Sequence, residues 1–539
     1  MQSFPPEANQ PPAKKILWAD DEIDFLKPHI MFLEQKGYSV TSVANGDDAV
    51  EYARSGRFDI IMLDEMMPGK DGLCALAEIR DFNPSVPIIM VTKSEEERLM
   101  EEALGQKITD YLTKPVNPSQ ILLILKKIFD TKKIAREKLA RDYSQEFMNI
   151  SQAITADLET EEWVNIFLKT IEWEMELDQF PELGFQQTVQ DLQRDCNANF
   201  CRFMEKNYKD WIHSSAGGRS ASGGKDRPVF STDVFPRWVF PKLRDGKKVV
   251  FILLDCLRTD QWLAMEPFLH DYFQITRDYY FSILPTATPY ARNAIFSGLF
   301  PRDLEYKMPE LWHQGEEDEH SSNRFEHQFL DEFVKKSNFD HPVTTRYVKI
   351  LDAQEARSTE KHLLTHVQHD LFCMVVNFID ILAHQRSESD ILKEIAPDES
   401  AYRSLIKSWF EHSALLSMLR TLASEGNTVV ITTDHGSIRG KRPTKVVGDR
   451  ETSTSLRYKF GRNLQCNPKH VMHIKNPPEY LLPQRSVNTQ YIMAKEDYYL
   501  IYPSDYNKYA AKYKDCFHHG GISLEEIILP VVTLEGLKR

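Results

Sequence analysis

Short apolar runs that lead into an acidic residue recur along this chain. Phe58–Leu63 is followed by Asp64, and the continuous run VVFILL is followed by Asp255. A third run, Thr428–Thr432, leads into Asp434. Continuous apolar runs of this kind indicate strands that are covered on both faces, as in α/β proteins. Because polar groups that follow parallel strands gather at one edge of a sheet, we expect acidic sites at such an edge.

The size and composition of the chain fit a multidomain globular protein. Its 539 residues, 42% hydrophobic and 27% charged, allow about two or three domains. A net charge of −14 argues against nucleic-acid binding by the whole surface. No apolar run is long enough to span a membrane, and the N-terminal MQSFPPEANQPPAKK lacks the apolar core of a signal peptide. We therefore expect a cytoplasmic protein, in which the seven scattered cysteines are reduced.

Strands alternate with helices over residues 14–130, which predicts a flavodoxin-like doubly wound parallel sheet. Polar residues at the strand ends are expected in one crevice: Asp20, Asp21, Asp64, Thr92 and Lys114. Clustered carboxylates repel one another unless a hard cation lies among them, and their oxygens suit Mg²⁺. One carboxylate can then attack a phosphoryl donor while Lys114 and Thr92 contact the phosphate oxygens. The alternative is that these strand-end residues only face solvent. The number of such residues in one sheet disfavours it.

This segment resembles the response regulator receiver family through four motifs: DD at 20–21, D…MPG.DG at 64–72, Thr92 and KP at 114–115. The resemblance implies phosphorylation of Asp64 by a sensor histidine kinase and a switch aromatic at Tyr111. It also implies a Mg²⁺ site, whose ligands would be Asp20, Asp21, Asp64 and the carbonyl of Met66. The pair Trp18-Ala19 departs from the family pattern but leaves the acid pair intact.

Residues 131–213 predict a bundle of about three to five helices. Apart from Pro181 the segment has no proline and no strand pattern, and apolar residues recur at helical spacing. Its aromatic stripes are expected in a core or in helix–helix contacts. No helix-turn-helix signature with a basic recognition helix is present, so sequence-specific DNA binding is not expected. The Gly/Ser-rich stretch that follows predicts a flexible linker over residues 214–230.

The stretch FSILPTATPYARNAIFSGLFP, Phe281–Pro301, organises the remaining segment, residues 231–539. It predicts a strand, a tight turn with Thr286 and Thr288, and a helix over Ala291–Phe296. A hydroxyl at a helix N-terminus, where free N–H groups and the dipole favour an anion, can hold a phosphoryl group. Thr-Pro before a helix is more often only an N-cap. The hypothesis that this turn holds a phosphoryl group therefore depends on support from residues elsewhere.

Strand-end acids and histidine motifs accompany this turn: Asp255, Asp380 with His384, Asp434-His435 and His518-His519. Each motif alone is more often a cap, a turn or a solvated surface group. Together in one α/β domain they favour a metal site. Histidine and aspartate ligands suit zinc, with manganese as the second choice.

The same residues, in the same order, resemble the alkaline phosphatase superfamily. The resemblance implies two zinc sites, one made by Asp380, His384 and His519 and the other by Asp255, Asp434 and His435. Thr288 would lie between the zinc ions and attack phosphorus, giving a phospho-threonine that water hydrolyses. Thr286 is the alternative nucleophile, and His518 is the alternative ligand.

Two stretches indicate one branch of the alkaline phosphatase superfamily: DCLRTDQW at 255–262 and HHGGISLEEIILP at 518–530 resemble PglZ domains. A receiver, a helical middle and a PglZ domain in one chain resemble response regulators of type IX secretion. That resemblance implies a zinc phosphodiesterase acting on linear or cyclic oligonucleotides, with a secretion-system component and a sigma factor as partners. Receivers commonly pair through one face, so we expect the phosphorylated chain to be a homodimer.

Arg292 lies four residues after Thr288, a spacing that resembles the sulfatase signature. A sulfatase nucleophile is made from cysteine or serine, so Thr288 argues against that branch. Two roles for Arg292 carry equal weight here, a contact with a phosphate oxygen and a charge on a helix surface.

A basic run extends from Arg439 to Lys475, with ten Lys and Arg residues opposed only by Asp449 and Glu451. The run begins just after Asp434-His435, which favours an anion-binding rim over a solvated loop. The substrate-binding residues expected in it are Lys441, Arg442 and Lys445.

Three functions stay open at this stage. The first is a phosphorylation-controlled zinc phosphodiesterase. The second is a signalling adaptor whose zinc domain only binds secretion or sigma-factor partners, but an intact Thr288 with a full ligand set favours catalysis. The third is a phosphomonoesterase or phosphomutase of the same fold. The lack of a clear third-metal carboxylate set favours diesters over monoesters.

Overall fold

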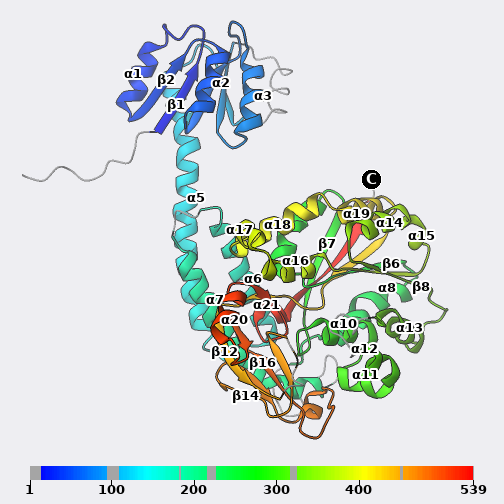
Figure 1. Cartoon of the computed structure of the whole chain (residues 1–539). Coiled ribbons are helices and arrows are strands. Elements are labelled where there is room, and N and C mark those ends of the chain that lie inside the picture. The colour runs from blue at the N-terminus through cyan, green and yellow to red at the C-terminus, as the bar shows by residue number, and fades with distance from the viewer. Residues whose placement is uncertain are drawn as a thin grey trace, which may run out of the picture. The chain divides into compact units, whose positions relative to one another are not determined.

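The computed structural model describes residues 14–93, 108–180, 184–214, 226–315, 324–449, 453 and 455–537. It divides into two compact units, Met1–Asp142 and Tyr143–Arg539 (Figure 1). The division falls inside one long helix, α5 (Pro118–Ala153). The boundary predicted between residues 130 and 131 therefore lies within a continuous helix.

The N-terminal unit holds a sheet of five parallel strands in the order β2-β1-β3-β4-β5. Side chains alternate along β1, so that Leu17 packs with the core beside α2 and α3, whereas Trp18 packs with the core beside α1 and α5. The predicted doubly wound sheet is therefore confirmed. Its elements are β1 (Lys14–Ala19), α1 (Lys27–Gln35), β2 (Tyr38–Val43), α2 (Gly46–Ser55), β3 (Ile60–Asp64), α3 (Gly72–Phe82), β4 (Ile88–Thr92) and β5 (Asp110–Thr113).

The second unit is built on a six-stranded mixed sheet in the order β7-β19-β10-β6-β9-β8. Strands β10, β6, β9 and β8 are parallel to one another. At one side β19 is antiparallel to β10, and β7 is antiparallel to β19. The predicted α/β architecture is confirmed. The strands are β6 (Val249–Leu254), β7 (Phe273–Phe281), β8 (Thr345–Ile350), β9 (Leu371–Val376), β10 (Thr428–Thr432) and β19 (Ile528–Gly536).

Both faces of this sheet are covered, as its continuous apolar strands require. Along β6, Phe251 lies in a core shared with α10 and α13, and Ile252 lies in a core shared with α9, α18 and α19. The helices of these layers are α8 (Phe240–Arg244), α9 (Thr259–Met265), α10 (Thr288–Ser297), α11 (Pro301–Lys307), α12 (Pro309–Gly315), α13 (Glu326–Lys336), α14 (Ala353–Lys361), α15 (Leu363–His366), α16 (Phe378–Glu388), α17 (Asp390–Ile395), α18 (Glu399–Glu411) and α19 (Ala414–Ser424).

The predicted helical middle is helical, and it packs into the core of the second unit. Its helices after α5 are α6 (Thr160–Leu177) and α7 (Gln186–Ile212). Phe200 of α7 meets the ring of Phe281 edge-on, with ring centroids 5.9 Å apart. Asn197 of α7 accepts a hydrogen bond from the Leu524 backbone N–H at 2.8 Å. Of the predicted linker 214–230, residues 215–225 lie outside the described residues.

Small sheets and short helices complete the second unit towards its C-terminal end. These elements are β11 (Ile438–Arg439), β12 (Arg442–Val447), β13 (Tyr458–Gly461), β14 (Gln465–Cys466), β15 (Val471–Ile474), β16 (Gln490–Ala494), β17 (Tyr498–Ile501), α20 (Tyr506–Tyr513), β18 (Phe517–His518) and α21 (Leu524–Ile527). Among the described helices, none is long and apolar enough to cross a membrane.

Candidate functional site

Three neighbouring parallel strands bring the predicted acids together at one edge of the six-stranded sheet. Strand β6 lies between β10 and β9, with Leu253 opposite Thr432 and Leu254 opposite Val376. Asp255 follows β6 directly, and the acids after β10 and β9 follow within a few residues. The edge therefore collects Asp255, Asp380 and Asp434 without any long loop, as expected for the carboxyl ends of parallel strands.

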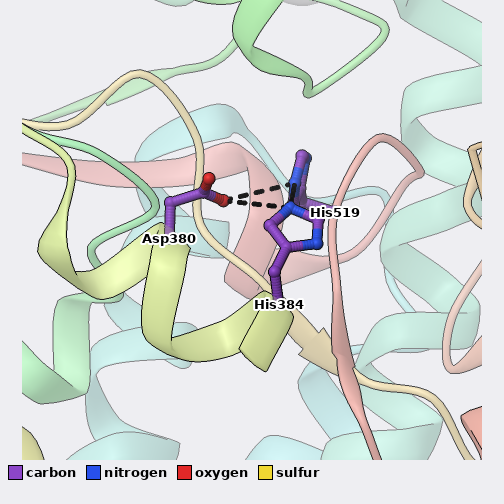
Figure 2. A group of neighbouring side chains, drawn as sticks. All are labelled: Asp380, His384 and His519. Carbon is purple, nitrogen blue, oxygen red and sulfur yellow. Dashed lines mark hydrogen bonds and ion pairs between the residues drawn. The ribbon is translucent and has the colours of Figure 1, made fainter. Parts of the chain in front are cut away.

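Asp380, His384 and His519 form what we call the outer cluster (Figure 2). Asp380 and His384 lie one turn apart on α16, so both point from the same face of that helix. The Asp380 Oδ1 atom lies 3.4 Å from His384 Nε2 and 3.5 Å from His519 Nε2. The two Nε2 atoms are 3.3 Å apart. Three ligand atoms therefore converge on one point from two segments of the chain.

Asp255, Asp434 and His435 form the inner cluster, which is buried. His435 Nε2 lies 3.8 Å from Asp255 Oδ1 and 3.8 Å from Asp434 Oδ2. The Nδ1 atom of His435 is 3.1 Å from the Gly436 carbonyl, and donation of its hydrogen there leaves Nε2 as the lone-pair atom. The rings of His435 and His519 stack with centroids 4.1 Å apart, so the two clusters adjoin.

The predicted nucleophile lies at the inner cluster. Thr288 is the first residue of α10, and its Oγ1 atom is 2.9 Å from His435 Nε2. Thr286 is instead fully buried and donates to the Gly521 carbonyl at 2.8 Å, while accepting from Gly520 N at 3.2 Å. Thr286 thus secures the backbone that follows His519, and Thr288 is the hydroxyl that faces the clusters.

The two adjacent histidines at 518 and 519 have different surroundings. His518 Nε2 lies 3.1 Å from the Tyr513 carbonyl, and His518 is not among the residues whose ligand atoms converge. His519 joins the outer cluster. His518 is the last residue of the short strand β18, and His519 follows it outside the strand.

The donor atoms of both clusters fit zinc. Zinc in proteins takes histidine nitrogen and carboxylate oxygen, and each cluster offers both kinds of atom. Among the described side chains, Asp255 Oδ1, Asp380 Oδ1 and His519 Nδ1 are buried without a hydrogen-bond partner. Buried carboxylate oxygens without partners are costly, and a cation at each cluster would satisfy them.

The sequence analysis names no role for Asn377, and it leaves Arg292 open between a contact with a phosphate oxygen and a charge on a helix surface. Asn377 donates to Asp255 Oδ2 at 2.7 Å, and its only sequence signal is its position directly after the apolar run of β9. Arg292 is fully buried and pairs with both inner carboxylates, Asp255 and Asp434. The alternative that Arg292 is a helix-surface charge is therefore wrong.

Burial and the Arg292 charge act against each other at the inner carboxyls. Burial raises the pKa of the Asp255 carboxyl well above its usual range. Burial also acts to raise the pKa of Asp434, but Arg292 and His435 outweigh it and lower that pKa below its usual value. Burial lowers the pKa of the His519 ring well below its ordinary value, which favours the neutral, ligating form.

The N-terminal unit contains a third group of converging acids, Asp20, Asp21 and Asp64. Lys114 Nζ lies 2.9 Å from Asp20 Oδ2 and 2.9 Å from Asp64 Oδ2. The Thr92 hydroxyl donates to Glu65. Tyr111 is 44% exposed and Met66 is 69% exposed, so neither is buried in the core. The strand ends therefore bring Asp20, Asp21, Asp64 and Lys114 together.

Comparison with known families gives three matches in sequence order. A response regulator receiver domain matches residues 16–126, and a PorX response regulator linker domain matches residues 133–212. The BREX system PglZ alkaline phosphatase-like domain matches residues 234–534, more than half of the chain. The chain belongs to the PglZ alkaline phosphatase-like family. With the receiver and linker matches, this PglZ chain is similar to PorX, and the resemblances found in the sequence are confirmed.

Curated relatives and solved structures match a smaller share of this PglZ chain. Transcriptional regulatory protein ResD of Bacillus subtilis is 36% identical over 112 residues, which cover 21% of this chain and 46% of ResD. BaeR of Escherichia coli is 35% identical over 144 residues, covering 26% of this chain and 58% of BaeR. The chain thus spans about half the length of these relatives.

Among solved structures, a receiver domain of sensor histidine kinase PA1611 from Pseudomonas aeruginosa, with magnesium in its active site cleft, is 33% identical. That match has a TM-score of 0.20 and covers 21% of this chain and 96% of the other. A CheY-like receiver domain protein from Methanospirillum hungatei is 26% identical, with a TM-score of 0.22, and covers 23% of this chain and 98% of the other.

The basic run of the PglZ domain is less free than its sequence suggests. Arg442 pairs with Glu496 at 2.5 Å and also with Asp497. Arg457 is fully buried and pairs with Glu526 at 2.5 Å. Asp449 and Glu451 are the only acids within the run, but acids distant in sequence pair with part of it in the fold.

Asp64→Asn should stabilise the metal-free protein at pH values above about 6, because it removes the Asp64 charge. Burial and the neighbouring Asp20 charge raise the pKa of Asp64 from 3.8 to about 6, against the opposing effect of Lys114. The folded state then binds the proton more tightly than the unfolded state does, so stability falls as the pH rises from about 4 to about 6. The loss is on the order of 1–3 kcal/mol, and Asp64→Asn should lack it. Denaturant unfolding in the presence of a chelator measures it.

The control is Asp59→Asn, because the pKa of Asp59 is lowered rather than raised. Burial acts to raise that pKa, but hydrogen bonds from Lys15 and Lys14 more than offset it. Asp59 should therefore add stability as the pH rises through the acid range, and Asp59→Asn should remove that gain. An identical pH profile for Asp64→Asn and the wild type would contradict the role of Asp64.

Proposed function

We propose that the chain is a two-component response regulator, phosphorylated on Asp64, whose output domain is a zinc-dependent phosphodiesterase. The observation that carries the proposal is the Thr288 hydroxyl, 2.9 Å from His435 and beside two adjoining Asp/His clusters. A domain that only binds a partner needs no hydroxyl at that point. The PglZ match indicates a hydrolase of the alkaline phosphatase superfamily, and the proposal specifies its metal and substrate.

Asp380, His384 and His519 would hold one zinc ion, and Asp255, Asp434 and His435 would hold the other. When bound, zinc would favour the ionised Thr288 hydroxyl and neutralise charge on the phosphoryl oxygens and the leaving group. Thr288 Oγ forms a bond to phosphorus while the bond from phosphorus to the leaving oxygen breaks. Water then cleaves the Thr288–phosphate ester and restores the hydroxyl. The N-terminal end of α10 adds a favourable dipole for the anionic group.

The substrate proposed is a linear or cyclic oligonucleotide. Lys445 is exposed and Lys441 is half-buried, so both remain candidates to contact further phosphates. Arg442 remains a candidate only if phosphate competes with Glu496 and Asp497 for its guanidinium. Arg292, proposed to contact the reacting phosphate, could do so only by giving up part of its pairing with Asp255, Asp434 and Glu326.

The experiment that tests this function combines two measurements on the same purified chain. Metal analysis counts zinc per chain, and a panel of linear and cyclic dinucleotides, a small chromogenic diester and a monoester measures turnover. We expect two zinc ions and preferential cleavage of dinucleotides. Bound zinc without cleavage of any ester would favour the adaptor function, and preferential cleavage of the monoester would favour a phosphomonoesterase.

The receiver match implies a sensor kinase as partner, and its proposed cofactor is Mg²⁺ held by Asp20, Asp21, Asp64 and the Met66 carbonyl. Similarity to PorX supports a role in type IX secretion, with a secretion-system component and a sigma factor as further partners.

Phosphorylation should convert the monomer to a homodimer through the face that carries Tyr111. Tyr111 is 44% exposed on β5, next to the strand that ends at Thr92, so a change around Asp64 can reach that surface. Light scattering with Mg²⁺ and a phosphoryl mimic should show a doubled mass. Asp64→Ala is the control and should stay monomeric. Equal dimerisation of the variant, or an unchanged wild-type mass, would contradict the proposal.

A further inference from the structure

One guanidinium reaches three carboxylates from three separate segments of the second unit. Arg292 Nε lies 2.9 Å from Asp434 Oδ2, its Nη2 pairs with Asp255 Oδ2, and its Nη1 is 3.5 Å from Glu326 Oε1. The Arg292 side chain is fully buried, and the three acid side chains are at most 1% exposed. Buried charges of this kind are tolerated only when they are paired.

The third carboxylate is itself held in place. Glu326 is the first residue of α13, and it accepts a hydrogen bond from the Tyr347 hydroxyl on the neighbouring strand β8. Lys349, also on β8, places its Nζ atom 3.4 Å from Glu326 Oε1. Groups outside the two metal clusters thus also fix the position of Arg292.

Arg292 does not contact every carboxylate oxygen of the inner cluster that could bind a metal. Arg292 uses the Oδ2 atoms of Asp255 and Asp434. Asp255 Oδ1 is buried without a hydrogen-bond partner among the described residues, and it faces His435 Nε2 at 3.8 Å. Asp255 Oδ1 therefore stays available to a metal beside His435 Nε2, whereas Asp434 Oδ2, which lies 3.8 Å from the same nitrogen, also contacts Arg292.

We propose that Arg292 is the resident cation of the inner cluster, a positioning residue that holds Asp255 and Asp434 together before a metal binds. The proposal rests on the metal centre proposed above. In the metal-free protein Arg292 offsets the repulsion of two buried carboxylates, which is part of what a metal does in the loaded protein. Folding of the inner cluster then does not depend on metal, and zinc adds less stability than it would without Arg292.

The test is the zinc-induced rise in melting temperature of the full chain, measured between chelated and zinc-loaded samples. Arg292→Met keeps the length of the side chain and removes its charge. Its metal-free form should be destabilised more than its zinc-loaded form, so its zinc-induced rise should be at least about twice that of the wild type. Arg292→Lys keeps a positive charge and should lie between the two.

The matched control is Arg403→Met. Arg403 is 4% exposed and also holds three acids, Glu174 at 3.1 Å, Asp178 at 2.7 Å and Asp260 at 2.6 Å, none of which belongs to a metal cluster. Its loss should lower the melting temperature equally with and without zinc. A zinc-induced rise in Arg292→Met that equals or falls below the wild-type rise would overturn the proposal, because Arg292 would then act like Arg403 or only orient ligands.

A milder variant covers the case in which Arg292→Met fails to fold even with zinc. Glu326→Gln leaves Arg292 in place and removes the charge of the third acid. The positive charge of Arg292 is then shared by the two inner carboxylates alone. The zinc-induced rise should then be no larger than in the wild type, and a larger rise would overturn the proposal. A wild type that binds no zinc and shows no rise would instead refute the proposed metal centre itself.

Discussion

Thr288→Ala is expected to lower dinucleotide turnover by about 10³-fold or more while zinc content stays at the wild-type value. The Thr288 hydroxyl lies 2.9 Å from His435, where it can attack phosphorus. Its removal leaves the six Asp and His ligands of the two clusters untouched. Turnover and metal analysis on the same preparation separate these two effects.

The control is Thr286→Ala, which removes a hydroxyl two residues away on the same turn. Among the described residues, the Thr286 hydroxyl bonds the backbone of Gly520 and Gly521, so its loss should reduce stability and leave most of the turnover. Near-normal turnover by Thr288→Ala would refute the nucleophile assignment. A dead Thr286→Ala protein with normal zinc would move the assignment to Thr286.

His519→Ala should lose one zinc ion per chain and nearly all turnover, whereas His518→Ala should keep both ions. The two histidines are adjacent in sequence, yet His519 Nε2 faces His384 at 3.3 Å, and His518 Nε2 faces the Tyr513 carbonyl. Losing a ligand from a site with three protein ligands removes most of its metal affinity. Zinc content and dinucleotide turnover of both variants measure the difference.

The pair also provides an internal control for folding, because the two residues are adjacent in sequence and both changes delete an imidazole. His518→Ala loses the hydrogen bond to Tyr513 and should lower the melting temperature slightly. Equal zinc loss in both variants would show that the segment rearranges as a whole and that the assignment of His519 alone is wrong.

The sheets and the residues at their ends could be predicted from the sequence because each depends on local patterns. Asp255, Asp380 and Asp434 follow runs that are apolar throughout, and parallel strands in one sheet then bring their ends together. The separation of His518 from His519 could not be derived from spacing, since it depends on the backbone path at the end of β18, which stops at His518.

The environment of the charged residues could not be predicted in the same way. Of the acids that pair with Arg292, Glu326 lies 34 positions after it, Asp434 lies 142 positions after it and Asp255 lies 37 positions before it. No local window contains them. Arg442 likewise pairs with Glu496, 54 positions away. Local charge counts describe a stretch of sequence, whereas the net charge of a surface depends on all segments that fold onto it.

The helical middle was predicted as a separate bundle because its own periodicity is complete. Its apolar stripe is satisfied in the structure by the rest of the second unit, since Phe200 and Trp211 share one core with Phe230 and Phe281. Amphipathic helices reveal that a face is buried but do not reveal which segment buries it.

That shared core sets the limits of any shortened chain that is meant to work alone. A fragment starting at residue 231 would expose the surface that Trp163, Phe200 and Trp211 cover, and the Leu524 N–H would lose its acceptor on Asn197. The helix α21 that begins there lies only a few residues after His519. A recombinant output fragment should therefore begin near Tyr143, at the start of the second unit, and include α6 and α7.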